Sequence, residues 1–341
     1  MKIYSSFRIE RMIVFGFLAV ILAGTFALWF GNMPYRRVPL LDCLFTATSA
    51  VCVTGLSTLD TGTDFSQASQ IVILVLIQLG GLGVMTATTA LLYAFRRRIG
   101  IRQRMLFSGG LGLDSPSGAV RLAKKVVLIT VFIEAMGAIP MFFAFRSSFP
   151  GPRSLYLAVF HSVSAFCNAG FSPFSDSLQR FSGTVTIPLT VMTLILLGGA
   201  GFLVIDDIRN SLLHRGGRLS AHSRLVVAVS ALLVVGGALA ICVSDWNGAL
   251  AGHSWRWKLW NALFHSVSPR TAGFNTIPMD RLTSLGAFFT ILLMIIGASP
   301  GSTGGGIKTT SFALLMLSTA REIRCRARTC PRRHGAPWRR R

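Results

Sequence analysis

Glycine is the residue through which this chain could hold a bare cation. Gly55, Gly170 and Gly273 each follow a stretch of small and hydroxylated residues, nine or ten positions after a phenylalanine. A glycine can adopt positive φ values and so turn the neighbouring carbonyl oxygens toward an axis. Rings of such oxygens replace the hydration shell of an ion in selective pores. One loop supplies only part of a ring, so the repetition of this glycine predicts an ion site.

The three glycines belong to one repeated segment. Its copies read LFTATSAVCVTGLSTLD from Leu44, VFHSVSAFCNAGFSPFSD from Val159, and LFHSVSPRTAGFNTIPMD from Leu263. One such glycine would be read as a turn between helices, whereas three in the same relative place indicate a repeated pore element. The carbonyls expected to contact the ion are those of Val53, Thr54, Gly55, Asn168, Ala169, Gly170, Thr271, Ala272 and Gly273.

Apolar segments must position these loops. Of the 341 residues, 52% are hydrophobic and 13% charged, which is typical of a membrane protein. A crossing needs roughly 20 apolar residues. Six runs meet that length, at residues 12–30, 66–95, 126–145, 181–205, 225–244 and 282–307.

The repeated segments are too short and too polar to cross, so each is expected to dip into the bilayer and return. The sequence therefore predicts an all-α membrane protein. Its tandem units of crossing, pore helix, filter loop and crossing are expected to be arranged pseudo-symmetrically around a central ion path.

The net charge of +22 would suggest a nucleic-acid partner in a soluble protein. Here the cations gather in two connections, 96–119 and 209–224, whereas the alternate connections carry more acids. Basic connections of this kind lie on the cytoplasmic side. We therefore expect membrane lipid, and no nucleic acid, as a partner.

The repeats also set the expected organisation. Beyond residue 320 the sequence is rich in arginine and has no apolar run, so we interpret it as an aberrant tail that replaces a fourth repeat. The expected boundaries are 1–95 for repeat 1 (filter near 53–57), 96–119 for a basic connection, 120–208 for repeat 2 (filter near 168–172), 209–224 for a second connection, 225–320 for repeat 3 (filter near 271–275, glycine-rich loop 297–310), and 321–341 for the tail.

The glycine-rich loop GASPGSTGGGIKTT at 297–310 is no phosphate-binding loop. That motif requires G-x-x-x-x-G-K-[ST] after a strand, but Ile307 separates Gly306 from Lys308 and the flanks are membrane-spanning. An unwound, glycine-rich segment inside a crossing can rearrange at low cost. A glycine-packed helix crossing is the alternative interpretation.

Several motifs together carry a family resemblance. VCVTGLS, FCNAGFS and RTAGFN resemble the first three filter loops of the KtrB/TrkH/HKT superfamily of potassium transporters, and QLGGLGVMT and LLGGAGFLVID are similar to its crossings after the first two filters. The resemblance covers residues from about 10 to about 322. It implies a gate beneath the filter, formed by Gly301, Ser302, Thr303, Gly304, Gly305, Gly306 and Lys308.

The resemblance also implies an activity and partners. It implies potassium uptake by the ion-translocating subunit of a Trk/Ktr-type system in the bacterial plasma (inner) membrane, with no enzymatic activity and no cofactor besides the transported ion. A homodimer and a cytoplasmic nucleotide-binding regulatory subunit of the KtrA/TrkA type are expected, with the basic connections as docking places.

The residues alone leave alternatives open. They reach only a monovalent-cation pore, because carbonyl number and filter flexibility decide between potassium and sodium. A non-conducting truncated product or a structural subunit is a second alternative. A carrier that rocks its repeats is a third, although such carriers have inverted repeats and these repeats run in the same sense.

Six charged residues lie near the predicted filters or inside an apolar run. Asp60, Asp64, Asp176 and Asp280 follow the filters and would either concentrate cations at the mouth or act as solvated loop acids. Arg270 is expected to turn away from the axis and pair with a pore-helix end. Glu134, inside an apolar run, is expected to line the ion path or to bond a neighbouring helix.

Overall fold

Helices make up all the regular structure that the computed structural model describes, which covers residues 3–83, 116–213 and 219–327. The all-α prediction is therefore confirmed for these residues. The helices are α1 Ile3–Asn32, α2 Leu40–Val51, α3 Gln67–Leu82, α6 Pro116–Arg146, α7 Gly151–Phe166, α8 Thr186–Ala200, α9 Phe202–Leu213, α10 Ala221–Asp245, α11 Trp255–Val267, α12 Ser284–Ile295 and α13 Thr309–Ala327, with 3-10 turns η1 Gln179–Phe181 and η2 Met279–Arg281.

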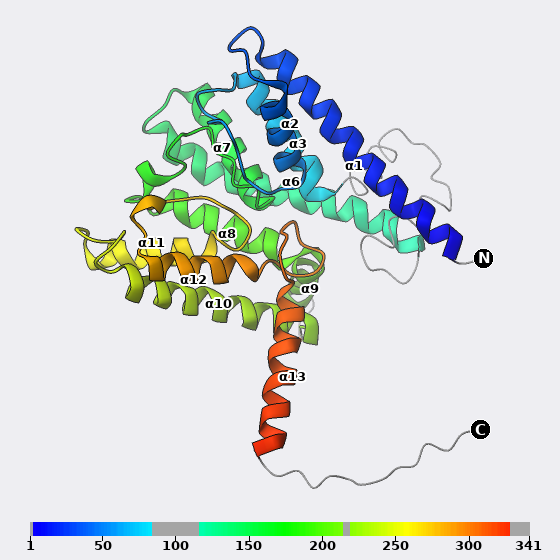
Figure 1. The fold of residues 1–341 in the computed structure, drawn as a ribbon, viewed down its shortest axis with the longest axis vertical. Helices are drawn as coiled ribbons and strands as arrows, with labels where there is room; N and C mark the ends of the chain where they lie inside the picture. Colours follow the sequence, from blue (N-terminus) through cyan, green and yellow to red (C-terminus); the bar gives the residue numbers. More distant parts are fainter. Residues whose placement is uncertain (1–2, 84–115, 214–218, 328–341) are drawn as a thin grey trace.

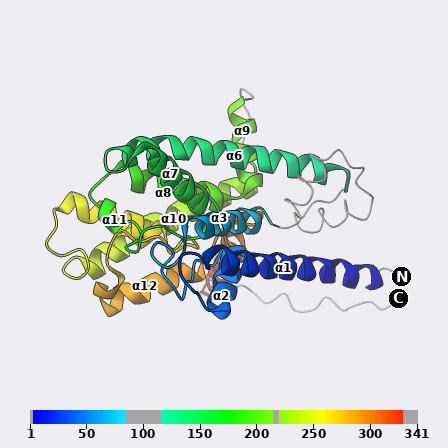
Figure 2. The ribbon, with the colours of Figure 1, turned by 90° about the horizontal axis from the view of Figure 1, so that it is seen from above.

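Three units of long helix, short helix, loop and helix follow one another along the chain. They are α1–α2–α3, α6–α7–α8 and α10–α11–α12, which occupy successive positions in Figure 1 from blue to orange. The units are linked in the same way, because α7 packs against α3 of the preceding unit and α11 packs against α8. The helix α13 projects away from the other helices (Figure 1) and contacts α10. In the view from above, α3 lies between α1 and α6 (Figure 2).

Fewer complete spans are found among the described residues than the six predicted. Three helices, α1, α6 and α10, are long and apolar enough to cross a membrane, and α8 with α9 is a fourth candidate that bends by 101°. The difference arises because glycine interrupts the apolar runs: Gly83 and Gly201, at equivalent places in two units, have φ values of 76° and 86° and end α3 and α8. The predicted run 66–95 also continues beyond the described residues.

Two glycines allow the second crossing of a unit to lie directly on its pore helix. A Cβ atom at Gly80 of α3 would overlap the Val51 carbonyl oxygen, and one at Gly198 of α8 would overlap the Phe166 carbonyl oxygen. Val51 and Phe166 are the last residues of α2 and α7. These contacts fix where the C-terminal ends of the two pore helices lie, and so where the filter loops begin.

Buried side chains at the ends of α1 and α10 fix the opposite ends of the units. The Asn32 side chain accepts a hydrogen bond from the Ser66 N–H at 2.7 Å and donates one to the Asp64 carbonyl at 2.9 Å. Asp245 accepts one from the Thr283 N–H at 2.8 Å. Ser66 and Thr283 are the N-caps of α3 and α12, so the first and last helices of the first and third units are held in register.

Three predicted features lie wholly or partly outside the described residues. They are most of the basic connection 96–119, the middle of the connection 209–224, and the tail from residue 328. The repeat boundaries and the docking role of these connections stay predictions.

Adjacent glycines in α8 give a matched test of this packing. Gly198→Ala should lower stability by about 1–3 kcal/mol, the usual cost of overpacking, because its Cβ would overlap the Phe166 carbonyl. Gly199→Ala should be neutral or stabilising, since its Cβ would lie an ordinary 3.7 Å from Ala298 and alanine favours a helix. Thermal unfolding of the purified protein in detergent measures both, and equal losses would contradict the packing argument.

Candidate ion-binding site

The three repeated glycines lie side by side. A Cβ atom at Gly55 would be 3.4 Å from the Cα of Gly170, and a Cβ atom at Gly170 would be 3.3 Å from the Cα of Gly273. Gly55 is thus adjacent to Gly170, and Gly170 to Gly273. Segments more than 100 residues apart in sequence meet at one place, so the structure brings together the loops that the sequence singled out.

The loops share an unusual backbone conformation. Gly55, Gly170 and Gly273 have φ values of 76°, 74° and 81°, as expected. The residues two positions earlier also have positive φ, 54° at Val53, 59° at Asn168 and 76° at Thr271.

This second set of positive φ values was not expected from the sequence. Asparagine tolerates the left-handed region, but a β-branched valine or threonine is rare there, and such strain costs about 1–3 kcal/mol per residue. The alternation of positive and negative φ recurs in all three loops, so the surrounding structure imposes it. Strained backbone of this kind clusters at functional sites, so the positive φ values of Val53 and Thr271 make these loops candidates for a functional site.

The carbonyl oxygens of the loops accept no hydrogen bond within the part of the chain that the structure describes. No described residue donates a hydrogen bond to any of the nine carbonyl oxygens of residues 53–55, 168–170 and 271–273. Most of the amide groups, by contrast, donate hydrogen bonds: Thr54 N–H donates to Ser49 O and Ala169 N–H to Ser164 O, both at 2.8 Å, and Gly273 N–H donates to Ser268 O at 3.0 Å. The loops are therefore folded back onto their pore helices through their N–H groups, while their carbonyl oxygens stay available as acceptors.

The pore helices add charge complementarity. Each of α2, α7 and α11 ends immediately before its filter loop. A helix C-terminus carries a partial negative charge of roughly half an electron, which favours a nearby cation. Acceptors without donors, together with three helix C-termini, make this a place for a cation rather than an anion.

A serine at or near the C-terminal end of each pore helix occupies the same repeat position, and two of the three bond the residue after the filter glycine. The Ser164 hydroxyl donates to Phe171 O at 2.8 Å, and the Ser268 hydroxyl donates to Phe274 O at 2.5 Å. Ser49 holds the equivalent position in the first unit, but its buried hydroxyl has no partner among the described residues. These serines were not singled out from the sequence, although aligning the three segments places them in one column.

The glycine-rich loop between α12 and α13 is folded on itself. Ile296 and Ile307 form a parallel bridge, and Ala298 N–H donates to Gly305 O at 3.1 Å. The ammonium group of Lys308 donates to Gly304 O at 2.8 Å, which closes the loop from its far end. The loop is therefore an ordered, non-helical segment rather than a continuation of α12.

This loop contacts two of the filter loops directly. The Thr303 hydroxyl accepts a hydrogen bond from the Asn168 side-chain amide at 2.9 Å and donates one to Phe166 O at 3.0 Å. Gly304 lies so close to Thr271 that a Cβ atom there would overlap the threonine side chain. The predicted gate residues thus lie against the second and third filter loops.

The same loop also satisfies the C-terminal end of α8. Ser299 N–H donates to Gly199 O at 2.9 Å, Thr303 N–H donates to Gly198 O at 3.3 Å, and the Ser299 hydroxyl donates to Ala200 O. The last carbonyls of a helix have no partner within the helix. The break at Gly201 therefore supplies the acceptors that hold the loop in place.

The acids outside the filters are partly neutralised. Asp64 pairs with Arg36, and Asp176 pairs with Arg180 at 2.7 Å. The Asp60 side chain accepts the Gly62 N–H at 2.7 Å. Three of the four acids thus stabilise loop structure, which favours the interpretation of loop acids over a field that attracts cations.

Arg270 and Glu134 are both buried and take part in bonds between helices. The Arg270 guanidinium donates to the Ser230 hydroxyl on α10 at 3.3 Å, so it reaches a crossing rather than the pore-helix end that was expected. The Glu134 carboxylate accepts from the Gln78 amide of α3 at 3.1 Å and lies 3.9 Å from the Cys167 sulfur. Cys167 directly precedes the second filter loop, so Glu134 supports that loop from behind.

The serine column gives a second matched test. Ser164→Ala should lower stability by about 1–3 kcal/mol, because it leaves the buried Phe171 carbonyl without its donor. Ser49→Ala should have almost no effect, since that hydroxyl has no described partner to lose. Thermal unfolding in detergent compares them, and a loss at Ser49 as large as at Ser164 would contradict this role of the column.

Comparisons with known proteins identify the family to which the chain belongs. A family model described as TrkH, cation transport protein, matches residues 10–329. The potassium/sodium uptake protein NtpJ of Enterococcus hirae is 36% identical over 310 residues, covering 90% of this chain and 68% of that protein. The Ktr system potassium uptake protein B of Bacillus subtilis is 34% identical over 325 residues, covering 95% of this chain and 73% of that protein.

A solved structure has the same fold. The crystal structure of the potassium transporter TrkH from Vibrio parahaemolyticus matches with a TM-score of 0.69 at 22% identity, over 92% of this chain and 63% of that one. The chain therefore spans between about three fifths and three quarters of the length of these proteins. The family match, the identities and the apolar helices together establish that the chain is a multi-pass membrane protein and a member of the TrkH family of cation transport proteins.

Proposed function

We propose that the chain is the ion-translocating part of a potassium uptake system of the Trk/Ktr type. The observation that carries the proposal is the meeting of three loops whose nine carbonyl oxygens have no donor among the described residues. A dehydrated potassium ion needs several such oxygens at once. The loops around Gly55, Gly170 and Gly273 would each supply part of that coordination, with the helix C-termini behind them adding favourable potential.

Potassium is preferred over sodium in this proposal. The relatives from Vibrio alginolyticus and Bacillus subtilis are named potassium uptake proteins, and the relative from Enterococcus hirae is named for potassium and sodium. Sodium transport is therefore the second candidate. A homodimer and a cytoplasmic nucleotide-binding regulatory subunit, implied by the family resemblance, belong to the same proposal.

The loop from Gly301 to Lys308 would act as the gate. It lies against the second and third filter loops and is held there by hydrogen bonds of Thr303 and Ser299 rather than by an apolar core. A segment held by hydrogen bonds, with little buried apolar surface, can move without unfolding its surroundings. Displacement of the loop would open the path beneath the filter.

Substitution of a filter glycine tests the ion site. Gly170→Ser should lower potassium uptake about tenfold or more, the effect of losing 1.4 kcal/mol of ion stabilisation, because a side chain at a φ of 74° would overlap the Ala272 carbonyl. Gly183→Ser is the control, since a Cβ atom there would meet open space. Growth on limiting potassium, in a bacterial strain without its own uptake systems, is the measurement. Unchanged uptake and selectivity in Gly170→Ser would contradict the filter.

The same strain separates conduction from a structural role. The 341-residue chain should be compared with a chimera that continues into the remaining part of the Bacillus subtilis relative. Rescue by the chain alone supports conduction by this polypeptide, whereas rescue by the chimera only supports the non-conducting or structural alternative. Absence of rescue by either, with both present in the membrane, would count against potassium uptake.

The gate has its own test. Thr303→Val removes the hydroxyl that contacts Phe166 and Asn168 while keeping the shape of the side chain. The loop should be displaced more readily, so the initial rate of rubidium uptake should rise. Thr190→Val is the control, because that exposed hydroxyl bonds only within its own helix. A fall in uptake would mean that the loop supports the filter instead of closing it.

A further inference from the structure

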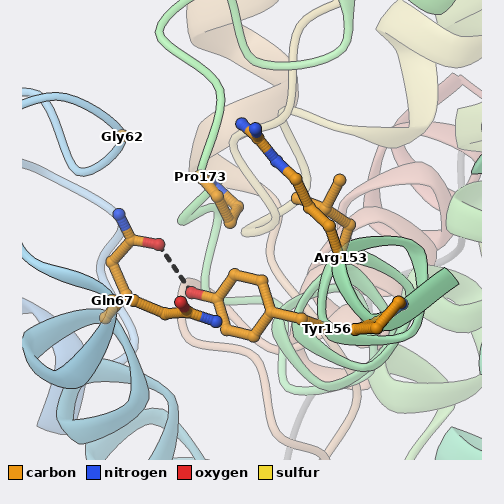
Figure 3. A pocket seen from close by; sticks show the side chains of 8 residues that line it. Gly62, Gln67, Arg153, Tyr156 and Pro173 are labelled. Carbon is orange, nitrogen blue, oxygen red and sulfur yellow. Dashed lines mark hydrogen bonds between the residues drawn. The ribbon is translucent and has the colours of Figure 1, made fainter. Parts of the chain in front are cut away.

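A cavity of about 410 Å³ lies between the first and second units and is lined by none of the nine residues with the predicted filter carbonyls. Figure 3 shows it from close by, with side chains from α3 on one side and from α7 on the other. The residues that line it are Gly62, Gln67, Gln70, Pro152, Arg153, Tyr156, Leu157 and Pro173. Its volume is within the range of sites that hold small molecules or headgroups.

The lining carries positive charge and no acid. Arg153 is the one ionisable lining residue charged at neutral pH, and its guanidinium lies 5.3 Å from the centre of the Phe149 ring without a carboxylate partner among the described residues. The helix α7 begins at Gly151 beside this arginine, and no side chain caps it. The free N–H groups of a helix start add positive potential. The cavity is therefore suited to an anion.

On one wall of the cavity the polar side chains of Tyr156 and Gln70 already have hydrogen-bond partners within the protein. The Tyr156 hydroxyl donates to Gln70 Oε1 at 2.5 Å, and the Gln70 amide donates to Thr61 O and Phe65 O at 2.9 and 3.0 Å. These bonds join α7 to α3 and to the loop before it. Arg153 and Gln67 have no such bonds within the described residues, so they are the groups left to bind a ligand.

Apolar side chains continue from the cavity along both helices. One turn beyond Gln67 on the same face of α3 lies Ile71, which is 47% exposed. Beyond Tyr156 on α7 lies Val159, which is 39% exposed. A polar, cationic cavity at the start of two helices, followed by apolar side chains deeper along both, matches the polar head and the acyl chains of a phospholipid.

We propose that this cavity binds one anionic membrane phospholipid, with the phosphate against Arg153 and the acyl chains along α3 and α7. Arginine at the membrane surface attracts anionic headgroups, and tyrosine is enriched at the same level. Gly62 packs against the Pro173 carbonyl at the edge of the cavity, which joins the loops that follow the first and second filters. The bound lipid braces these two loops at the outer ends of the pore helices.

The test is lipid binding by the full chain, and its readout does not depend on ion transport. Purified protein in detergent is titrated with phosphatidylglycerol, phosphatidylcholine or the soluble headgroup analogue glycerol phosphate, and bound molecules are counted by native mass spectrometry. Arg153→Gln is the test variant. Arg146→Gln is the matched control, because Arg146 is also exposed and also lies over a phenylalanine ring, but does not line the cavity.

The proposal expects one phosphatidylglycerol to bind more tightly than phosphatidylcholine. Arg153→Gln should weaken the affinity for phosphatidylglycerol roughly fivefold, the effect of one arginine near an anionic surface. Arg146→Gln should leave this affinity unchanged. Equal weakening by both variants would show general attraction of lipid around the protein and would overturn the proposal. Binding of glycerol phosphate as tight as that of the lipid, with the same dependence on Arg153, would make the cavity a site for soluble anions and would also overturn it. Unfolding temperatures without added lipid check that both variants fold.

Discussion

Carbonyl oxygens without donors are the constraint on which this structure depends. An unpaired backbone group in lipid costs several kcal/mol, so such groups persist at membrane depth only inside protein or beside water. The filter loops after α2, α7 and α11 place nine of them together, and the amides of the same loops bond back to the pore helices. Keeping these acceptors unpaired and away from lipid requires several units around one path. The repeat architecture follows from that need.

The contacts that hold the loops are contacts of backbone with backbone. Gly80 and Gly198 bring a crossing onto the last carbonyl of a pore helix, and the filter glycines bring one loop onto the next. Side chains also enter as hydrogen-bond partners, such as Ser164 and Ser268, while Phe171 and Phe274, directly after two of the glycines, are buried in the hydrophobic core. Positions of this kind tolerate an added methyl group poorly, because a backbone carbonyl has no rotamer into which it can move away.

The sequence was sufficient for the class of fold and for singling out three glycine loops that meet in the structure, because glycine spacing and apolar length are local properties. The assignment of nine carbonyls in these loops to an ion filter stays a prediction. The sequence was insufficient for the number of complete spans. The break after α8 at Gly201 depends on a loop distant in sequence, whose Ser299 and Thr303 N–H groups donate hydrogen bonds to the last carbonyls of α8. The positive φ of Val53 and Thr271 was also missed: no propensity predicts it, and only the surrounding structure imposes it. Arg270 was expected to pair with a pore-helix end, but it bonds Ser230 of α10. This contact could not be predicted, because Ser230 and Arg270 are distant in sequence and meet only in the folded protein.

Within the proposed function, gate and filter share one side chain. The Asn168 amide nitrogen donates to Thr303 of the gate loop, and its backbone belongs to the second filter loop. Its buried side-chain oxygen has no partner among the described residues. Moving the gate loop removes the only described bond of that side chain and frees it to turn, in a residue already held at positive φ. An opening of the gate would therefore change the filter as well as the path beneath it, and an ion bound at the filter would favour one position of the gate. Reciprocity of this kind is required whenever two sites bias the same element.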